Sequence, residues 1–520
     1  MVGFSYLFPQ KHPMPAEANR TAAATQTAAA ATAPAAPATS TPASSSAPAA
    51  APAPGTPEST HPQTPTLCTI QAPTFTMTVD AYGRISSTRL LEAKYHTKEG
   101  EPLELFDPKQ VKPLEIRFAD PTLNTESFAT PYTASASSLT LADAPQSLVL
   151  TQKLTGTTVT KKLTFYPDGH YDLTVQTDKP VEFFVTPGHR PEADHARYMV
   201  VRGALIHDAK GVTTTVEDKK ADQPVTVPDA TIVSSFDRYT ASLFYRFDAP
   251  VSAVLTPEAN GNALPFVSAK GTLQLHGYIG PKEYRTLQHL DRRLTHAIEF
   301  GWFTFLSRPF FRVMLWIHDF VGNWGWAIML FTLLVKLVLF PLSYKGMMSM
   351  QKMKELAPKM KELKEKYKGD PAKQQQQTME LYKKHGANPM GGCLPMLLQI
   401  PVFFALYRVL LNADELQGAP WIGWITNLSD KDPMYILPVL MGITMWLMQK
   451  VQPNTMGDPM QQKIMQWFPV IMTFFFLTFP SGLVLYWLTN NVLSIGQQMI
   501  INRAWKNHKA KAKAKAHSDE

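Results

Sequence analysis

Two absences say most about this chain: cysteine is scarce throughout, and tryptophan is missing from the first 301 residues. Only two cysteines occur among 520 residues, Cys68 and Cys393, so the sequence predicts neither a disulfide framework nor a cysteine metal site. All ten tryptophans lie between Trp302 and Trp505, where most of the long apolar runs also lie. The preceding part is instead rich in Pro, Ala, Thr and Ser. This asymmetry predicts a soluble part joined to a membrane part.

A glycine-rich phosphate loop of the Walker type is also missing, and no catalytic constellation stands out. Histidines of the region 67–284 such as His170, His189, His195 and His207 are scattered rather than clustered. Asp168 lies in YPDGH, which is typical of a turn. We therefore expect no enzyme activity, no cofactor and no metal site.

The first 66 residues lack the features of a folded domain. Residues 1–8, MVGFSYLF, are shorter than the roughly 20 residues that a span requires, and they carry no basic head of a signal peptide. We expect them to be the remnant of an N-terminal span. Residues 9–66 are a low-complexity Ala/Pro/Thr/Ser segment, which predicts a disordered linker because such a composition buries no core.

Residues 67–284 change to an all-β pattern. Short stretches such as FTMTVD, SLVLTQKL, TVTKKLTFY, YDLTVQT and VEFFVT alternate apolar with polar residues and are separated by turn sequences. This pattern predicts one large β domain, either a sandwich or a barrel.

Residues 285–312 are predicted to be helical. Leu287, Leu290, Leu294 and Ile298 recur at helical spacing, with arginines between them and aromatic residues after them. A basic, one-sided helix is typical of a segment in the membrane interface. The alternative is an ordinary helix packed on the β domain.

Apolar runs in the C-terminal part predict a helical transmembrane bundle of five spans, near residues 323–342, 393–412, 433–450, 464–480 and 482–502. Lysines crowd the segment 344–388 and the tail 506–520, whereas the loop 413–432 is acidic. The positive-inside rule therefore places 344–388 and the C-terminus in the cytoplasm and the β domain outside.

The lysine-rich segment 344–388 reads as a helical hairpin, with an apolar stripe on one face and lysines on the other. Lys352, Lys359 and Lys366 are the candidate docking residues, for anionic lipid or for a ribosome-associated partner. The alternative is a solvated linker whose charges only provide solubility.

Lys336 places an ammonium inside the first apolar span, and it is the feature of the bundle that most needs an explanation. The lysine could snorkel to the interface and have no further role. However, Thr332 lies on its face, Gln399 lies in the next span, and Asn490 and Ser494 form a polar stripe with Tyr486 in the last. Such residues usually face each other, either as interhelical hydrogen bonds or around a site. Because the spans contain no acidic partner, we predict a water-containing cleft that opens toward the cytoplasm.

Two long stretches, GGCLPMLLQIPVFFALYRVL and DPMQQKIMQWFPVIMTFFFLTFPSGLVLYWLTNNV, together with the charged hairpin, resemble the YidC/Oxa/Alb membrane protein insertases over residues 285–505. The β domain is similar to the periplasmic β-sandwich of Gram-negative members, which also have an N-terminal span and an interfacial helix. The resemblance implies that Lys336 takes the place of the family's groove cation, commonly an arginine. It also implies that Tyr486 and Trp487 contact substrate.

What the resemblance implies is an insertase in the bacterial inner membrane, which works alone or with the Sec translocon. Its substrates are nascent membrane proteins, and its further partners are the ribosome or signal-recognition machinery and anionic lipids, without nucleic-acid specificity. Substrate would leave along the apolar faces of 393–412 and 464–480. The alternatives from the residues are a small-anion transporter and an envelope protein whose β domain binds carbohydrate.

Overall fold

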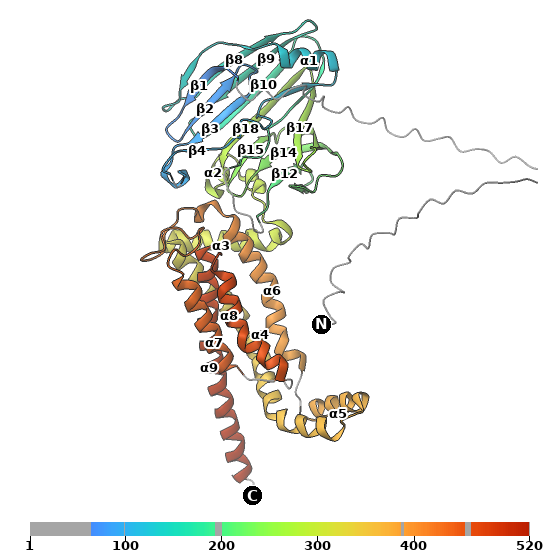
Figure 1. Cartoon of the computed structure of the whole chain (residues 1–520), viewed down its shortest axis with the longest axis vertical. Coiled ribbons are helices and arrows are strands. Elements are labelled where there is room, and N and C mark those ends of the chain that lie inside the picture. The colour runs from blue at the N-terminus through green and yellow to red at the C-terminus, as the bar shows by residue number, and fades with distance from the viewer. Residues whose placement is uncertain (1–63, 98, 193–199, 386–388, 453–458, 519–520) are drawn as a thin grey trace, which may run out of the picture. The chain divides into compact units, whose positions relative to one another are not determined.

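A computed structural model describes residues 64–97, 99–192, 200–385, 389–452 and 459–518. The predictions for residues 1–8 and for nearly all of 9–66 lie outside the described residues. The described chain forms a large β domain followed by helices (Figure 1), as the sequence predicts.

The β domain contains two sheets, whose pairs are antiparallel except for β1–β7. The five-stranded sheet has the order β4 (Leu103–Glu104), β3 (Ile85–Leu90), β2 (Phe75–Asp80), β1 (Thr66–Gln71), β7 (Ser138–Thr140). The larger sheet has the order β5 (Ile116–Phe118), β11 (Glu182–Val185), β17 (Ala263–Lys270), β16 (Val251–Pro257), β14 (Val225–Phe236), β15 (Thr240–Tyr245), β18 (Thr272–Pro281), β10 (His170–Thr177), β9 (Thr158–Phe165), β8 (Gln146–Lys153), β6 (Thr133–Ala134), with β12 (Gly203–Asp208) and β13 (Thr213–Glu217) attached through β14.

The alternating sequences form these strands because every second side chain enters the core. In β10, Tyr171, Leu173 and Val175 are buried while their neighbours are not. All five of the quoted sequence stretches are strands, namely β2, β8, β9, β10 and β11. Buried residues of both sheets, such as Met77 and Leu148, belong to one hydrophobic cluster. Of the two arrangements left open by the sequence, two sheets around a shared core is therefore the observed one.

The junction after the β domain differs from the continuous helix predicted over 285–312. It consists of α2 (Tyr284–Leu290), the short 3-10 helices η2 (Arg292–Ala297) and η3 (Gly301–Phe303), and then α3 (Thr304–Val321). Asp291 breaks the first helix because its backbone is extended and its side chain caps the Arg293 amide. Leu287 and Leu294 are fully buried with β-domain residues such as Leu243. This first part therefore packs on the β domain.

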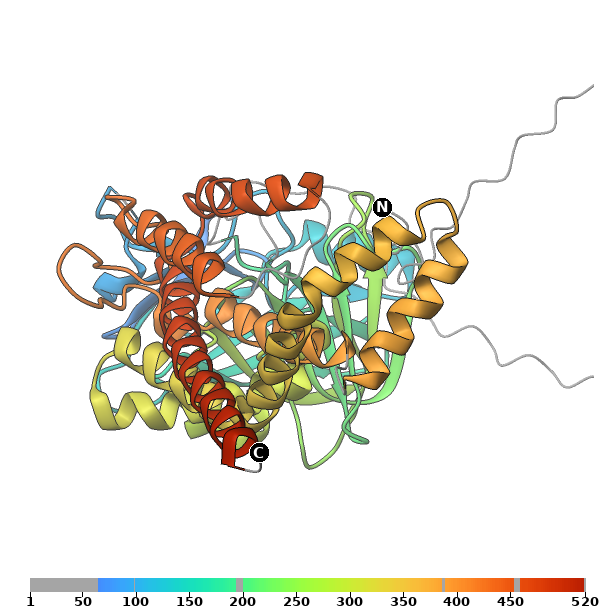
Figure 2. The same ribbon diagram turned by 90° about the horizontal axis from the view of Figure 1, so that it is seen from below.

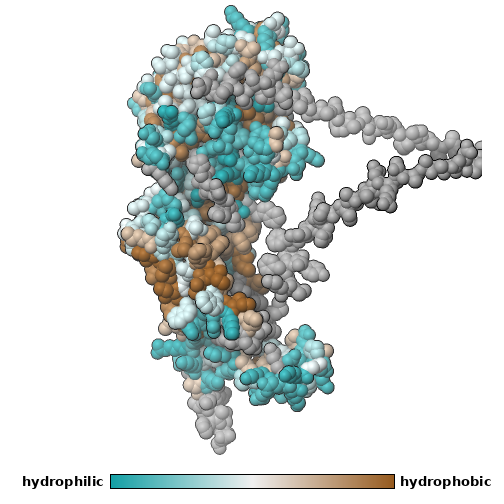
Figure 3. Space-filling view, viewed as in Figure 1, coloured by the Kyte–Doolittle hydropathy of each residue, from teal (hydrophilic) through white to brown (hydrophobic). Residues whose placement is uncertain are grey.

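The helical part contains α4 (Trp324–Lys366), α5 (Pro371–Lys384), α6 (Pro389–Asn412), α7 (Ile436–Val451), α8 (Pro459–Phe476) and α9 (Ser481–Ser518). By length and composition, one described helix could cross a membrane, namely α4. Shorter apolar stretches occur at Gln399–Asn412, Ile436–Val451 and Lys463–Phe476. In Figure 3, hydrophobic side chains gather over this bundle, and hydrophilic ones cover the end that carries α5.

Helix α4 has 43 residues, so at about 1.5 Å per residue it is roughly 65 Å long. That is about twice the thickness of a bilayer's hydrocarbon core, which is about 30 Å. After the turn at Tyr367–Asp370, α5 runs back beside the second half of α4 (Figure 2). Helix α9 packs against both α4 and α7, and α6 packs against α4. Three helices that are distant in sequence, α4, α6 and α9, therefore surround one space.

Candidate functional site

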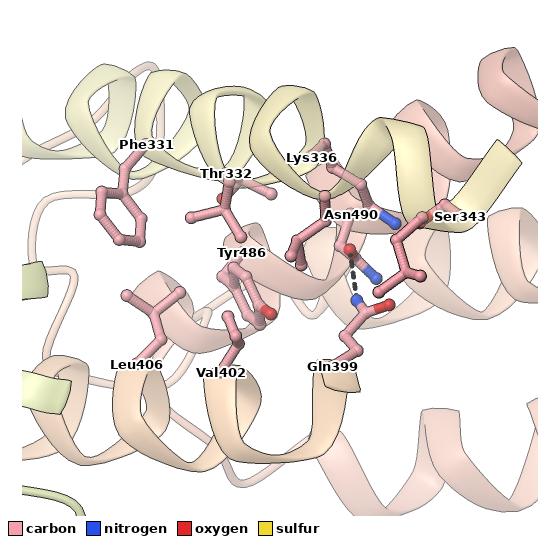
Figure 4. Close-up of a pocket in the computed structure, with 12 residues that line it drawn as sticks. Phe331, Thr332, Lys336, Ser343, Gln399, Val402, Leu406, Tyr486 and Asn490 are labelled. Carbon is pink, nitrogen blue, oxygen red and sulfur yellow. Dashed lines mark hydrogen bonds between the residues drawn. The ribbon is translucent and has the colours of Figure 1, made fainter. Parts of the chain in front are cut away.

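A cavity lies between α4, α6 and α9. Twelve residues line it: Phe331, Thr332, Val335, Lys336, Leu339, Leu342, Ser343, Gln399, Val402, Leu406, Tyr486 and Asn490. Polar side chains, including Lys336, Gln399 and Asn490, lie at one end of the cavity, and Phe331 and Leu406 lie at the other (Figure 4). The polar end is the one nearer to the C-terminal half of α4.

Helical spacing explains why these residues converge. On α4, Thr332, Lys336, Leu339 and Ser343 are separated by three or four positions, which puts them on one face. The same rule aligns Tyr486, Asn490 and Ser494 on α9, as the sequence predicts. Because α6 packs against α4 as well, Gln399 reaches the same space from a third helix.

The Lys336 ammonium is half-buried and donates a hydrogen bond to Ser494 Oγ at 2.7 Å. An ammonium has three donors. In the part of the chain that the structure describes, this bond is the one protein contact that the ammonium makes, and no carboxylate is paired with it. Two of its N–H groups are therefore available to another acceptor.

The remaining polar side chains join α6 to α9. Gln399 Nε2 donates to Asn490 Oδ1 at 2.8 Å, and the Tyr486 side chain is hydrogen-bonded to Gln399. Thr332 is buried and donates to the backbone oxygen of Ile328 on its own helix at 2.7 Å. The predicted groove residues therefore lie together, with Lys336 bonded to α9 and Gln399 bonded to two α9 side chains.

The space itself is narrow. It measures about 470 Å³ when counted out to its open mouth, but only about 20 Å³ can hold the centre of a water molecule. About one such probe volume is needed to hold an ordered water, so the cavity has room for one or two. The cleft predicted from the sequence coincides with this narrow cavity, and its water content stays a prediction.

Comparison with known proteins decides the family. Two family models match, "60Kd inner membrane protein" over residues 316–510 and "YidC periplasmic domain" over residues 262–313. The chain is 48% identical over 444 residues to the membrane protein insertase YidC of Campylobacter jejuni, covering 85% of this chain and 84% of that protein. It is 49% identical over 459 residues to the YidC of Wolinella succinogenes, covering 88% and 85%.

The chain belongs to the YidC family of membrane protein insertases. Such an insertase is an inner membrane protein with a periplasmic domain, and its substrates are nascent membrane proteins. The insertase prediction is confirmed, and it displaces the two alternatives, a small-anion transporter and a carbohydrate-binding envelope protein. A solved structure, "Active YidC insertase crystal structure with the first transmembrane domain resolved", aligns at 18% identity and a TM-score of 0.37, covering 83% of this chain and 94% of that one. The assignment rests on the sequence identities.

The predicted aromatic pair of this YidC-family chain is split between two environments. Tyr486 lines the cavity. Trp487 instead packs edge-on against Phe403 of α6, with ring centroids 4.8 Å apart, and lies 5.1 Å from the ring of Phe476 of α8. The indole therefore connects the three helices α6, α8 and α9 outside the polar end of the site.

The three predicted docking lysines lie away from the cavity. Lys352, Lys359 and Lys366 are all exposed on the second half of α4. They are seven residues apart, so they share one helical face. Lys359 Nζ lies 3.5 Å from His385 Nε2, just beyond the end of α5, and Lys366 Nζ lies 5.8 Å from the ring centroid of Tyr367.

Sequence reasoning missed several polar contacts of this YidC-family bundle, and one of them lies directly beside the site. Asn491 is buried and donates to Thr444 Oγ1 of α7 at 3.3 Å. The signal was the Asn490–Asn491 pair, because adjacent helical positions point about 100° apart and must meet different neighbours. Asn490 therefore faces the cavity while Asn491 holds α7. Among the described residues, no group of three or more His, Cys, Asp or Glu side chains is placed to hold a metal ion.

Proposed function

We propose that the cavity between α4, α6 and α9 is the resting form of a groove in which the polar flank of a nascent membrane protein meets Lys336. The observation that carries this proposal is the state of the ammonium. It faces the cavity, is paired with no described carboxylate, and uses one of its three donors. A charge kept inside an apolar bundle without a partner is costly, so it is expected to serve a ligand.

The proposed topology has five spans, formed by α4, α6, α7, α8 and α9. The C-terminal half of α4, α5 and the end of α9 lie in the cytoplasm, and the β domain lies in the periplasm. The length of α4 supports this topology, because the helix is about twice as long as a bilayer's hydrocarbon core is thick, so about half of it extends beyond the core. The proposed domains are 67–284, the junction 285–312 and the core 313–505, which includes the hairpin 344–388, followed by the tail 506–520.

The closed cavity cannot admit a polypeptide helix, whose diameter is about 10 Å with side chains. We therefore infer that the groove widens to take substrate, which enters from the polar end and leaves sideways. Helix α8 supports a sideways path because its apolar side chains are strongly exposed, with Trp467 at 65%, Ile471 at 60% and Phe474 at 79%. On α6, Leu397 and Ile400 are exposed as well. Transfer of apolar side chains from water to lipid supplies the driving force.

Partners at the cytoplasmic end follow from the lysine face of α4. Lys352, Lys359 and Lys366 present three cations on one exposed face, which suits ribosomal RNA, signal-recognition machinery or anionic lipid headgroups. This attraction is electrostatic and does not read a nucleic-acid sequence. The Sec translocon is also proposed as a partner, and this proposal is supported by the family assignment alone.

The experiment that tests this proposal compares two substrates that differ only in whether the flank carries acidic or neutral residues. Lys336→Met is expected to lower insertion of the acidic substrate about ten-fold or more, since a hydrogen bond to a charged group contributes about 1.5–3 kcal/mol. Insertion of the neutral substrate should change little. Lys336→Arg should retain insertion of both, because the charge remains.

Lys345→Met is the matched control, because Lys345 lies on the same helix but is exposed and outside the cavity. It should leave both substrates unaffected. Equal insertion of the acidic substrate by wild type and Lys336→Met, measured by protease protection in membrane vesicles, would contradict the proposed role of the charge.

A further inference from the structure

The Ser494 hydroxyl is fixed in the role of an acceptor. It donates its own hydrogen to the backbone oxygen of Asn490, one turn earlier on α9, at 2.7 Å. A hydroxyl has one donor and two acceptor lone pairs, so after this bond it can only accept. The Lys336 ammonium fills that acceptor position, also at 2.7 Å. Ser494 is buried, with 7% of its surface exposed.

The neighbouring amide is already engaged. Asn490 Oδ1, the next oxygen along the polar stripe of α9, accepts from Gln399 at 2.8 Å. Gln399 is held in turn by Tyr486. The ammonium is therefore held by one neutral hydroxyl, one turn beyond the α6–α9 bridge.

This bond is easy to exchange. When the ammonium leaves, Ser494 keeps its bond to the Asn490 carbonyl, so no buried donor is left unsatisfied. A carboxylate is the stronger acceptor for an ammonium, because its negative charge adds a Coulomb attraction that a neutral hydroxyl does not supply. An incoming carboxylate can therefore displace the hydroxyl, whereas a neutral hydroxyl or amide gains little over Ser494.

We propose that Ser494 is a specificity-determining residue, a competing internal acceptor that holds Lys336 against α9 until an acidic group of the substrate replaces it. This inference rests on the proposed role of Lys336 and adds its selectivity. A substrate flank binds the ammonium only if its interaction with Lys336 is stronger than that of Ser494, and Lys336 bonds to Ser494 again when the flank has left.

Two substitutions test the exchange because they are expected to act in opposite directions. Ser494→Ala removes the competitor, so an acidic-flanked substrate should bind more tightly by about ten-fold or more, which corresponds to the loss of one hydrogen bond to a charged group. Ser494→Asp supplies a permanent carboxylate, so it should lower insertion of the acidic-flanked substrate about ten-fold or more, as Lys336→Met does. Neutral-flanked substrate should be inserted normally by both variants.

Ser494→Thr is the matched control, because it keeps a hydroxyl at the same position and should behave as wild type. Photo-crosslinking of acidic-flanked and neutral-flanked nascent chains to the full-length protein in membrane vesicles gives the relative binding. Normal insertion of the neutral-flanked substrate shows that each variant is folded. If Ser494→Asp does not fold, Ser494→Ala carries the test alone.

A purely structural role predicts weaker insertion of both substrates by Ser494→Ala and Ser494→Asp alike, and that result would overturn the inference. Weaker binding of the acidic substrate alone by Ser494→Ala would also overturn it, since the hydroxyl would then be a substrate contact. The proposed function fails separately: it fails when Lys336→Met inserts the acidic substrate normally, whatever the Ser494 variants do.

Discussion

Two lysines lie away from the protein surface, one in the β domain and one in the helical bundle, and their ammonium groups differ in burial and in hydrogen-bond partners. Lys161 on β9 is 1% exposed, and its ammonium donates to the backbone oxygens of Gly83 and Leu114 at 2.9 and 2.8 Å. It also lies 4.6 Å from the ring centroid of Tyr132. Lys336 is half-buried and bonded to one hydroxyl, Ser494.

The surroundings of the two lysines differ in the same way. Beside Lys161, Arg84 bridges Asp80 at 2.8 Å and Glu115 at 3.2 Å. Every charge there has an internal partner, and the arrangement is closed. Around Lys336, by contrast, the described neighbours are neutral. Removing a member of a closed network leaves a buried charge without its partner and destabilises the fold, whereas a charge whose donors are not all used is available to a ligand.

The largest expected loss of stability comes from removing Arg84 from the ion-pair network beside Lys161. Arg84→Ala leaves the carboxylates of Asp80 and Glu115, which are 1% and 3% exposed, without this partner. Removing one partner of a buried ion pair costs about 3–5 kcal/mol of unfolding free energy. Hydrogen exchange of the β2 and β3 amides should report this loss in the full-length protein.

Arg89→Ala is the matched control for this prediction. Arg89 lies on β3, which begins directly after Arg84, but its side chain is 63% exposed and its ion pair with Glu104 is on the surface. The expected change is about 0–1 kcal/mol. Equal losses from Arg84→Ala and Arg89→Ala would remove the distinction between the closed network and an ordinary surface pair.

A smaller loss is expected when the β-domain lysine itself is removed. Lys161→Met leaves two buried carbonyls without their donor, each at a cost of about 1–3 kcal/mol, and it also relieves the burial of a charge. The net destabilisation should be about 2 kcal/mol. The measurement is again hydrogen exchange, now at β9 and β10, because the region 67–284 contains no tryptophan for fluorescence.

The sequence predicted the parts of this contrast that depend on local pattern. Alternation located β2, β8, β9, β10 and β11, and helical spacing placed Lys336, Gln399 and Asn490 around one space. Both signals work because side-chain direction follows from the period of the backbone. The resemblance to insertases, confirmed by the comparisons, came from motifs in the same helices.

What the sequence could not show depends on contacts between distant residues. Alternation puts Lys161 on the buried face of β9 with Val159 and Leu163, but it does not show what the ammonium meets there, because the carbonyl of Gly83 is 78 residues away. The break at Asp291 was missed because the flanking leucines keep helical spacing on both sides of it. The narrowness of the cavity depends on how closely three helices pack, which a polar stripe does not specify.

An intermediate effect is expected from pH. Burial lowers the pKa of Lys161 to about 7, so between pH 7 and 10 the unfolded chain binds more protons than the folded one. Stability of the β domain should therefore rise with pH over this window, by about 1 kcal/mol per unit, and the contribution is lost as pH falls through 7. Burial also lowers the pKa of Lys112, to about 8, in the same direction. The difference in stability between wild type and Lys161→Met isolates Lys161, and a difference independent of pH would contradict the assignment.

The smallest effect on stability is expected from Lys336→Met. This prediction tests the contrast between the two lysines most directly, because the helical bundle should not need the charge of Lys336 for its stability. Lys336→Met removes one hydrogen bond to Ser494, whose hydroxyl keeps its own bond to the Asn490 carbonyl. It also removes an ammonium from an apolar bundle and puts a side chain of similar length there. Replacing a poorly compensated charge by an apolar group is often neutral or stabilising.

We therefore expect the unfolding free energy of the bundle to change by less than about 1 kcal/mol. The tryptophans provide the measurement, since all ten lie at or beyond residue 302 and their fluorescence reports on the helical part. A loss of 2 kcal/mol or more would show that Lys336 stabilises the bundle as Lys161 stabilises the β domain. The two lysines would then have the same role, and any fall in insertion by Lys336→Met would follow from unfolding.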